Sequence, residues 1–386
     1  MSSIIEAFKN NIRQYSMLIA LIAIMLFFQV LTGGILLKPL NITNLVLQNS
    51  YILIMAIGML LVIVAGHIDL SVGSIVAFIG ATSAVMMVNL HINVGVTIVA
   101  CLLLGALIGA WQGFWVAYIK IPSFIVTLAG MLVFRGLTLV MLQGASVGPF
   151  PKAFQKISSG FIPDFFGGKD VHITTMVIAV CFLLAIVFVE LRSRSKKMAL
   201  GFAVSPKSVL IFKLLGISAA VLYLCSLLAS YKGLPNVLVV LFSLTVLYAF
   251  ITTQTVTGRR IFALGGNEQA AKLSGVKTRR LTLLTFANLG LLSALAGLVF
   301  AARLNVATPK AGTSFELDVI AACFIGGASA SGGVGTVIGA LIGALVMGVM
   351  NNGMSIMGIG IDWQQAIKGM VLLFAVFFDV YNKSKN

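Results

Sequence analysis

The sequence predicts an all-α protein, a polytopic integral membrane bundle of ten to twelve spans. Of its 386 residues, 60% are hydrophobic and 9% are charged, whereas about a quarter of a soluble domain is charged. The mean hydropathy is +1.09. The apolar residues also gather into runs of roughly 20, the length that crosses a bilayer as a helix.

The apolar runs predict the helices in order. The runs at 71–90 and 317–329 are the weakest, because the first starts with polar residues and the second is too short to span alone. No small-x-small cleavage pattern follows the first run, so we expect a retained helix rather than a signal peptide. The runs lie at about 17–37, 45–65, 71–90, 94–118, 124–142, 173–191, 209–231, 236–256, 281–301, 317–329, 335–355 and 363–381.

Basic residues in the loops predict the orientation, because Lys and Arg favour cytoplasmic loops. They gather before the first run (Lys9, Arg13), at 192–213, at 259–280 and at the end (Lys383, Lys385). Both termini are therefore expected in the cytoplasm. Residues 143–172, 230–236, 303–318 and 358–363 then lie on the far side.

A weak internal repeat predicts one transmembrane domain over 1–386, built from two related parts. "DLSVGSIVAFIGA" at 69–81 aligns with "SGGVGTVIGALIGA" at 331–344, and each copy starts an apolar helix after a break rich in small residues. The N-terminal repeat covers about 45–142 and the C-terminal repeat about 281–381. Repeats and broken helices are typical of transporters.

Several classes of site are excluded by composition. The net charge of +16 does not indicate nucleic-acid binding, because the basic residues lie in loops between apolar runs. The four cysteines lie in apolar runs without metal spacing, so we expect no disulfide and no metal. "FIGGASASGGVG" at 324–335 has no lysine, which argues against a nucleotide loop. We expect no cofactor and no catalytic residue.

"GHIDLSVGS", residues 66–74, is the most polar break. A Ser–His hydrolase is disfavoured, because the candidate groups lie within a few residues of one another and such groups usually converge from distant positions. The better interpretation is that Asp69 caps a helix starting near Leu70 and that the break is a hinge. Asp69 and Ser71 remain candidates for contact with a transported solute.

Uncharged amides inside the runs are further pathway candidates: Asn49, Asn288, Asn351 and Asn352. Such amides suit a neutral, hydroxyl-rich solute, and they suit bonds between helices equally well. No charged residue lies clearly at the centre of a span, so the sequence offers no evident buried acid for ion coupling. Uphill transport would then draw its energy from another chain.

The stretch "ALGGNEQAAKLSGVKTRR" stands out as an ordered polar segment between two spans. Asn267 is a suitable N-cap, "EQAAKL" contains good helix formers, and Gly275 can end the helix. A short, capped cytoplasmic helix over about 263–277 is a structure that can receive force from a partner.

Three of these stretches together resemble the permease subunit of ATP-binding-cassette importers for monosaccharides, of the ribose, galactose and xylose type. They are "GHIDLSVGS", "ALGGNEQAAKLSGV" and "ELDVIAACFIGGASASGGVGTVIGALIGALVMGVMNNGM". The extra region at about 192–235 and "WQQAIKGMVLLFAV" are similar to the xylose and multiple-sugar branch. The matching positions of the coupling-helix loop are Gly266, Asn267, Glu268, Ala270, Ala271, Ser274 and Gly275.

The resemblance implies a multi-pass protein of the bacterial plasma (inner) membrane, most similar to xylose permeases. It implies a permease homodimer, an ATP-binding-cassette ATPase subunit that binds the ATP inside, and a soluble sugar-binding protein outside. An ion-coupled secondary sugar transporter is the leading alternative, ahead of a passive channel or an intramembrane enzyme.

Overall fold

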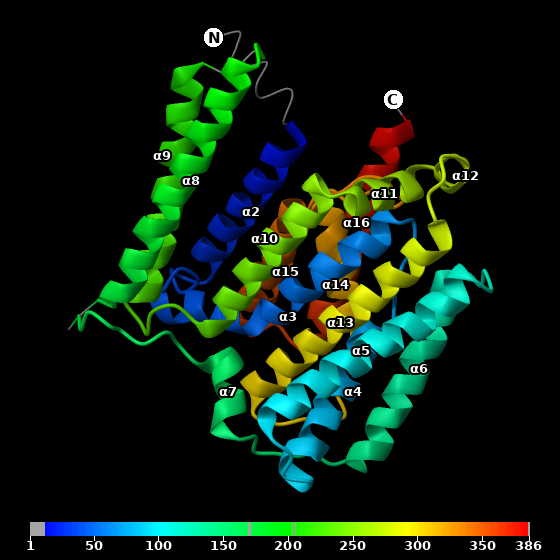
Figure 1. Cartoon of the computed structure of the whole chain (residues 1–386). Coiled ribbons are helices and arrows are strands. Elements are labelled where there is room, and N and C mark those ends of the chain that lie inside the picture. Colours follow the sequence, from blue (N-terminus) through cyan, green and yellow to red (C-terminus); the bar gives the residue numbers. More distant parts are fainter. Residues whose placement is uncertain (1–11, 169–170, 203, 205, 385–386) are drawn as a thin grey trace.

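The computed structural model describes residues 12–168, 171–202, 204 and 206–384, of which the side chains of 12–16 and 378–384 are not described. Lys9 and Lys385, used above to predict orientation, lie outside these residues. The described elements are helices, and the prediction of an all-α polytopic bundle is confirmed (Figure 1).

The first half of the chain forms the helices up to the far-side loop. They are α2 (Ile12–Leu31), α3 (Pro39–Val64), α4 (Val72–Ala84) with the π-helical η1 (Val85–Asn89), α5 (Val94–Ala117), α6 (Ser123–Leu142) and α7 (Lys152–Ser159).

The second half starts with a long hairpin and ends with the second broken region. Its helices are α8 (Ile173–Ala199), α9 (Lys207–Ala229), α10 (Asn236–Gln254), α11 (Val256–Gly266), α12 (Glu268–Leu273), α13 (Thr278–Leu304), α14 (Phe315–Ile325), α15 (Val337–Ile356) and α16 (Ile361–Ser384).

Nine of the described helices are long and apolar enough to cross a membrane. The weak run at 71–90 is one of them, as α4 continued by η1, whereas the weak run at 317–329 becomes the 11-residue α14. An 11-residue helix is about 16 Å long and cannot span a core of about 30 Å. α2 and α16, with 20 and 24 residues, coincide with the first and last predicted runs, and each includes residues whose side chains are not described. α7 and α11 were not predicted.

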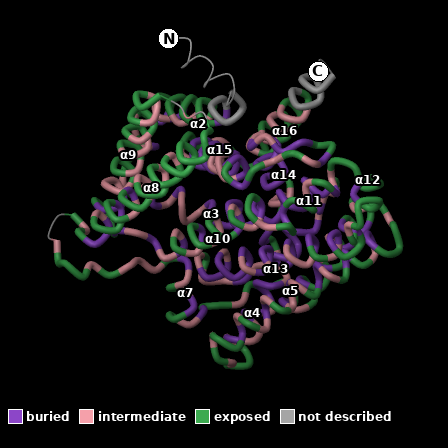
Figure 2. Tube along the Cα trace, turned by 45° about the horizontal axis from the view of Figure 1, so that its top comes forward, coloured by how far each residue is buried: buried purple, intermediate pink, exposed green. Residues whose placement is uncertain are grey.

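α3 and α13 form the centre of the bundle, and their side chains are buried along most of their length (Figures 1 and 2). α5 packs closely on α13 because both helices present glycine. A Cβ on Gly105 would lie 2.6 Å from the Gly290 carbonyl oxygen, and one on Gly109 would lie 2.2 Å from the Phe286 carbonyl oxygen. Small residues at such crossings let two backbones approach inside a membrane.

The far-side loop is ordered by one carboxylate. Asp164 accepts hydrogen bonds from the Thr174 hydroxyl at 2.7 Å and from the backbone N–H groups of Gly168 and Ile173, both at 3.1 Å. The Thr174 hydroxyl and these N–H groups hold the pKa of Asp164 well below its ordinary value. This loop meets the 305–314 segment through a backbone bridge between Val147 and Ala307.

The start of α2, the end of α16, the top of the α8–α9 hairpin and α12 all lie at one end of the bundle, at the top of Figure 1. The sequence predicted that the stretches 192–213 and 259–280 lie on the same side of the membrane, which is consistent with this placement. The two copies of the repeat start α4 and α15, each after a break, at this same end. Whether these copies arose by duplication stays a prediction.

Candidate functional site

α12 is a short, capped helix. The Asn267 side chain accepts a hydrogen bond from the Ala270 N–H at 2.9 Å, as an N-cap does. After the helix the chain turns at Gly275 with φ +81°, and the Gly275 N–H bonds back to a carbonyl of the last turn at 3.0 Å. The predicted cap and end of this helix are both confirmed.

α12 is exposed on most of its surface. Ala271 is buried and seats the helix, whereas Leu273 leaves 90% of its surface exposed. A single exposed leucine is ordinary on a protein surface, but this one is accessible to a partner that binds α12. Contact of these residues with an ATPase stays a prediction. Six of the seven predicted coupling residues are exposed: Gly266, Asn267, Glu268, Ala270, Ser274 and Gly275.

One ion pair holds α12 against the α5–α6 connection. Lys120 Nζ lies 2.9 Å from Glu268 Oε1, and both side chains are about half exposed (53% and 49%). The hydrogen bond from Lys120 lowers the pKa of Glu268. An ion pair so exposed stabilises by less than about 1 kcal/mol, so its effect is to orient α12 rather than to hold the fold.

The end of α11, just before α12, meets the region of the two helix breaks through backbone atoms. A Cβ on Gly265 would lie 1.6 Å from the Val64 carbonyl oxygen, at the end of α3. The same carbonyl accepts a hydrogen bond from the Gly333 N–H at 2.8 Å, and Gly332 lies against Gly66. The end of α11 therefore touches the last residue of α3 and the 326–336 break, and Gly332 of that break lies against Gly66 of the 65–71 break.

The 65–71 break carries a buried polar network. Asp69 Oδ1 accepts hydrogen bonds from the Ser71 N–H at 2.7 Å and the Ser71 hydroxyl at 2.6 Å, and Gln112 Nε2 of α5 donates to Ser71 Oγ at 2.9 Å. α4 begins at Val72, so the prediction that Asp69 caps a helix starting near Leu70 is wrong. Asp69 instead fixes the turn that leads into α4. Gln112 was missed, although a single amide in an apolar run is itself a signal.

Arg135 joins α6 to the 305–314 segment. Its guanidinium donates to the Ala311 carbonyl at 2.5 Å and to the Gly312 carbonyl at 3.3 Å. Gly312 in turn lies against the first turn of α4, where a Cβ on Gly73 would be 2.2 Å from the Gly312 oxygen and 2.4 Å from Glu316 Oε2. The segment expected on the far side thus folds inward and brings charged groups into the bundle.

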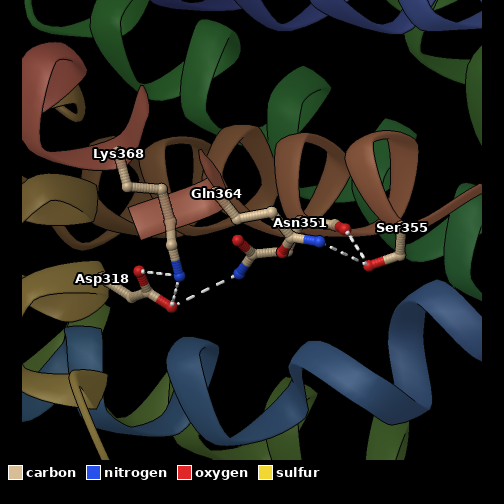
Figure 3. A network of polar contacts seen from close by, with 5 residues as sticks. All are labelled: Asp318, Asn351, Ser355, Gln364 and Lys368. Atoms are coloured by element: carbon tan, nitrogen blue, oxygen red, sulfur yellow. Dashed lines mark hydrogen bonds and ion pairs between the residues drawn. The ribbon is translucent and has the colours of Figure 1, made fainter. Parts of the chain in front are cut away.

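A second network joins α14, α15 and α16 (Figure 3). Lys368 Nζ lies 2.9 Å from Asp318 Oδ1 and 3.1 Å from Oδ2, and the Asn351 amide donates to Oδ2 at 3.3 Å. The side chains of Asp318 and Lys368 are only 4% and 16% exposed. Ser355 and Gln364 extend the network at 3.4 Å. The absence of a buried acid, inferred from the sequence, is therefore wrong, because Asp69 and Asp318 are both buried.

The remaining amides lie apart from one another. Asn49 donates to its own helix at Leu45 and packs against Gly348, and Asn352 forms a reciprocal pair with Asn41 at 2.8 and 3.1 Å. Tyr248 of α10 donates to the Asn288 side-chain oxygen. Two buried amide atoms, Asn288 Nδ2 and Asn351 Oδ1, have no hydrogen-bond partner within the described part of the chain. Within that same part, no three His, Cys, Asp or Glu residues gather as a metal site would require.

A protein-family comparison decides the class. Residues 41–376 match the family described as "Branched-chain amino acid transport system / permease component". The chain belongs to this permease family. The permease is 42% identical to the xylose transport system permease protein XylH of Escherichia coli, over 97% of this chain and 94% of that protein.

Two further relatives agree with this assignment. The permease is 41% identical to XylH of Haemophilus influenzae, over 97% of this chain and 98% of the relative. It is 35% identical to the ribose import permease protein RbsC of Escherichia coli, over 88% and 85% of the two chains. No solved structure matches. The resemblance to sugar permeases that the sequence motifs indicated is confirmed, and the permease is a multi-pass membrane protein.

Proposed function

We propose that the chain is the membrane-spanning subunit of an ATP-driven importer for xylose or a related aldose. The observation that supports this proposal is α12, a capped and exposed helix that directly follows the contact of Gly265 with the end of α3 and with the 326–336 break. The preference for xylose rests on the higher identity to the xylose permeases, 42% against 35% for the ribose permease.

The mechanism follows from this placement of α12. An ATPase subunit binds ATP and grips the exposed surface around Glu268 and Leu273. When the ATPase closes, it displaces α12, and the Gly265 contact passes that displacement to the 65–71 and 326–336 breaks. The bundle then exchanges outward for inward access, which is a population shift driven by the partner. The chain itself catalyses no reaction and binds no cofactor.

The assembly that this mechanism requires has three further parts. A second copy of the permease completes the path, and a soluble sugar-binding protein docks on the far-side segments 143–172 and 303–318. Both termini and α12 face the cytoplasm of a bacterium, in its inner membrane. The basic loops at the α12 end support this orientation.

Among the predicted pathway residues, the structure favours some over others. Asn288 and Asn351 each keep a buried amide atom without a partner in the described residues, so each can take up a sugar hydroxyl. Asn49 and Asn352 are engaged within the bundle. Asp69 and Ser71 bond to each other at the hinge before α4, so we assign them a hinge role.

The buried acids keep an ion-coupled sugar transporter as the second candidate, because such acids serve coupling ions in secondary transporters. Asp318 is already neutralised by Lys368 at 2.9 Å, which leaves it no free charge for a cation. Asp69, which accepts hydrogen bonds from Ser71, is then the acid that an ion-coupled transporter would use.

Uptake by reconstituted vesicles separates the two candidates. The tagged permease is purified in mild detergent with any co-purifying ATPase and sugar-binding protein, and labelled xylose uptake is measured with ATP or with an ion gradient. We expect uptake with ATP alone, and loss of uptake but not of assembly in Glu268→Ala and Gly275→Trp. Uptake by the lone chain under an ion gradient without ATP would overturn the proposal.

A further inference from the structure

The α8–α9 hairpin has little protein around it. α8 buries four side chains, all within residues 174–183, and α9 buries only Leu228 and Ala229. The described remainder of both helices, including the ends nearest their connection, is exposed or only half buried (Figure 2). In a bilayer these bare helices are surrounded by lipid, so the headgroup layer must meet the hairpin directly.

The hairpin is longer than the apolar layer. α8 has 27 residues and is therefore about 40 Å long, against a hydrocarbon core of about 30 Å. Its apolar part ends at Val189, and the last turns carry Arg192, Lys196 and Lys197, all exposed. Lys207 is exposed at the start of α9. These four cations project at the depth where phosphate groups lie.

Four cations of this end have no acidic partner among the described residues. Glu190 is the single acid between 190 and 213 in the sequence, and its carboxylate is 2.7 Å from Lys213 Nζ. Within the described residues, no ion pair joins an acid to Arg192, Lys196, Lys197 or Lys207. The end of the hairpin is thus an exposed positive surface, complementary to an anionic leaflet.

Apolar side chains accompany these cations. Leu200 and Phe202, in the α8–α9 connection, are 73% and 64% exposed. Exposed leucine and phenylalanine are unfavourable in water, but they insert into the headgroup boundary when basic residues flank them. An acidic soluble surface would pair with the cations, whereas a lipid surface takes up both the cations and the apolar side chains.

We propose that this basic tip, formed by Arg192, Lys196, Lys197 and Lys207, binds the phosphate headgroups of anionic phospholipids in the leaflet on the α12 side. Leu200 and Phe202 insert between the acyl chains. Lipid binding at this tip holds the hairpin, which packs weakly on the bundle, at a fixed depth in the membrane. It does not depend on which solute the permease carries.

A headgroup photo-crosslink tests the site directly. The full-length permease is reconstituted into phosphatidylcholine vesicles that contain a trace of either phosphatidylglycerol or phosphatidylcholine with a diazirine at the headgroup. After illumination, peptides covering 190–213 are quantified by mass spectrometry. Lys196→Gln/Lys197→Gln is compared with Arg279→Gln/Arg280→Gln, a matched pair of exposed cations at the start of α13.

Each basic residue at an anionic surface strengthens binding by roughly fivefold. We therefore expect the anionic probe to label residues 190–213 at least about tenfold more than the zwitterionic probe. The Lys196→Gln/Lys197→Gln variant should lose most of this preference, the control pair should keep it, and added salt should weaken it. Equal labelling by both probes, or a preference unchanged in Lys196→Gln/Lys197→Gln, would overturn the proposal. Loss of labelling when an ATPase subunit is added would also overturn it, in favour of a protein partner.

Discussion

Replacing Lys368 by methionine tests the Asp318 network most directly. Methionine keeps much of the side-chain volume and removes the ammonium, so the Asp318 carboxylate remains buried without its cation. Breaking a buried ion pair in this way costs about 3–5 kcal/mol. The Asn351 amide, 3.3 Å from Asp318 Oδ2, still donates to the carboxylate in the variant, which keeps the cost at the lower end of this range. We expect a net loss near 3 kcal/mol in the free energy of unfolding.

The opposite substitution should cost less. In Asp318→Asn, the Lys368 ammonium is left, but its side chain is 16% exposed against 4% for Asp318, and a lysine can extend toward the membrane surface. We expect a loss of about 1–2 kcal/mol. The double variant Asp318→Asn/Lys368→Met should be more stable than Lys368→Met alone, which gives a coupling energy of at least about 1 kcal/mol.

The assay is reversible unfolding of the purified permease in mixed micelles, followed by circular dichroism. Lys310→Met removes an exposed lysine and should stay within about 0.5 kcal/mol of the parent protein. The reasoning is refuted if Lys368→Met costs no more than Lys310→Met. It is also refuted if the two network variants are additive, because the pair would then not interact.

Three further outcomes follow from single positions. Gly275→Val should destabilise α12 by about 1–2 kcal/mol, because the residue has φ +81°, and hydrogen exchange of 268–273 measures the effect. Gly266→Ala is the control, because a Cβ there meets no atom within 4 Å and φ is ordinary. It should leave hydrogen exchange of 268–273 unchanged or slower. Gly109→Ala should lower the free energy of unfolding by about 1–3 kcal/mol, since its methyl group would meet an α13 carbonyl oxygen at 2.2 Å. Gly136→Ala, which has open space around it, should not lower it. Equal effects of the two substitutions would contradict the tight α5–α13 crossing. The pKa of Asp164 is lowered in the folded state. Its ionised carboxylate therefore adds to the free energy of unfolding above its unfolded pKa of about 3.9, and this stabilisation is lost as the pH falls further. Melting temperatures at pH 7 and pH 3 should differ more for the parent protein than for Asp164→Asn.

The features that the sequence predicted correctly depend on short-range chemistry. The Asn267 cap and the Gly275 turn are set by residues three to eight positions apart, and the helices follow from apolar runs of membrane length. The extent of α4 was harder, because a helix that starts after a polar break differs little in sequence from a loop. α14 shows the same ambiguity at 11 residues.

The charged residues inside the bundle were missed because their positions depend on tertiary contacts that the sequence does not show. Glu316 and Asp318 stand at the end of a polar segment, which in a linear view belongs to a solvent loop. The segment instead folds back into the bundle, where Arg135 binds the carbonyls of Ala311 and Gly312. Lys368 lies in an apolar run, and that position alone was a usable signal for a buried partner. Nothing in the sequence paired it with Asp318, because 50 residues separate them.

The contact of Gly265 with Val64 and Gly333 has a mechanical and a thermodynamic consequence. Side-chain contacts can yield by changing rotamer, but a contact between backbones has no such compliance, so a displacement of α12 that moves Gly265 is passed to Val64 and Gly333. The linkage must also run backwards. If the arrangement of the breaks depends on whether solute is bound, then solute changes the affinity of α12 for its partner by the same factor by which the partner changes the affinity for solute. The permease would in this way report its own occupancy to the motor that drives it.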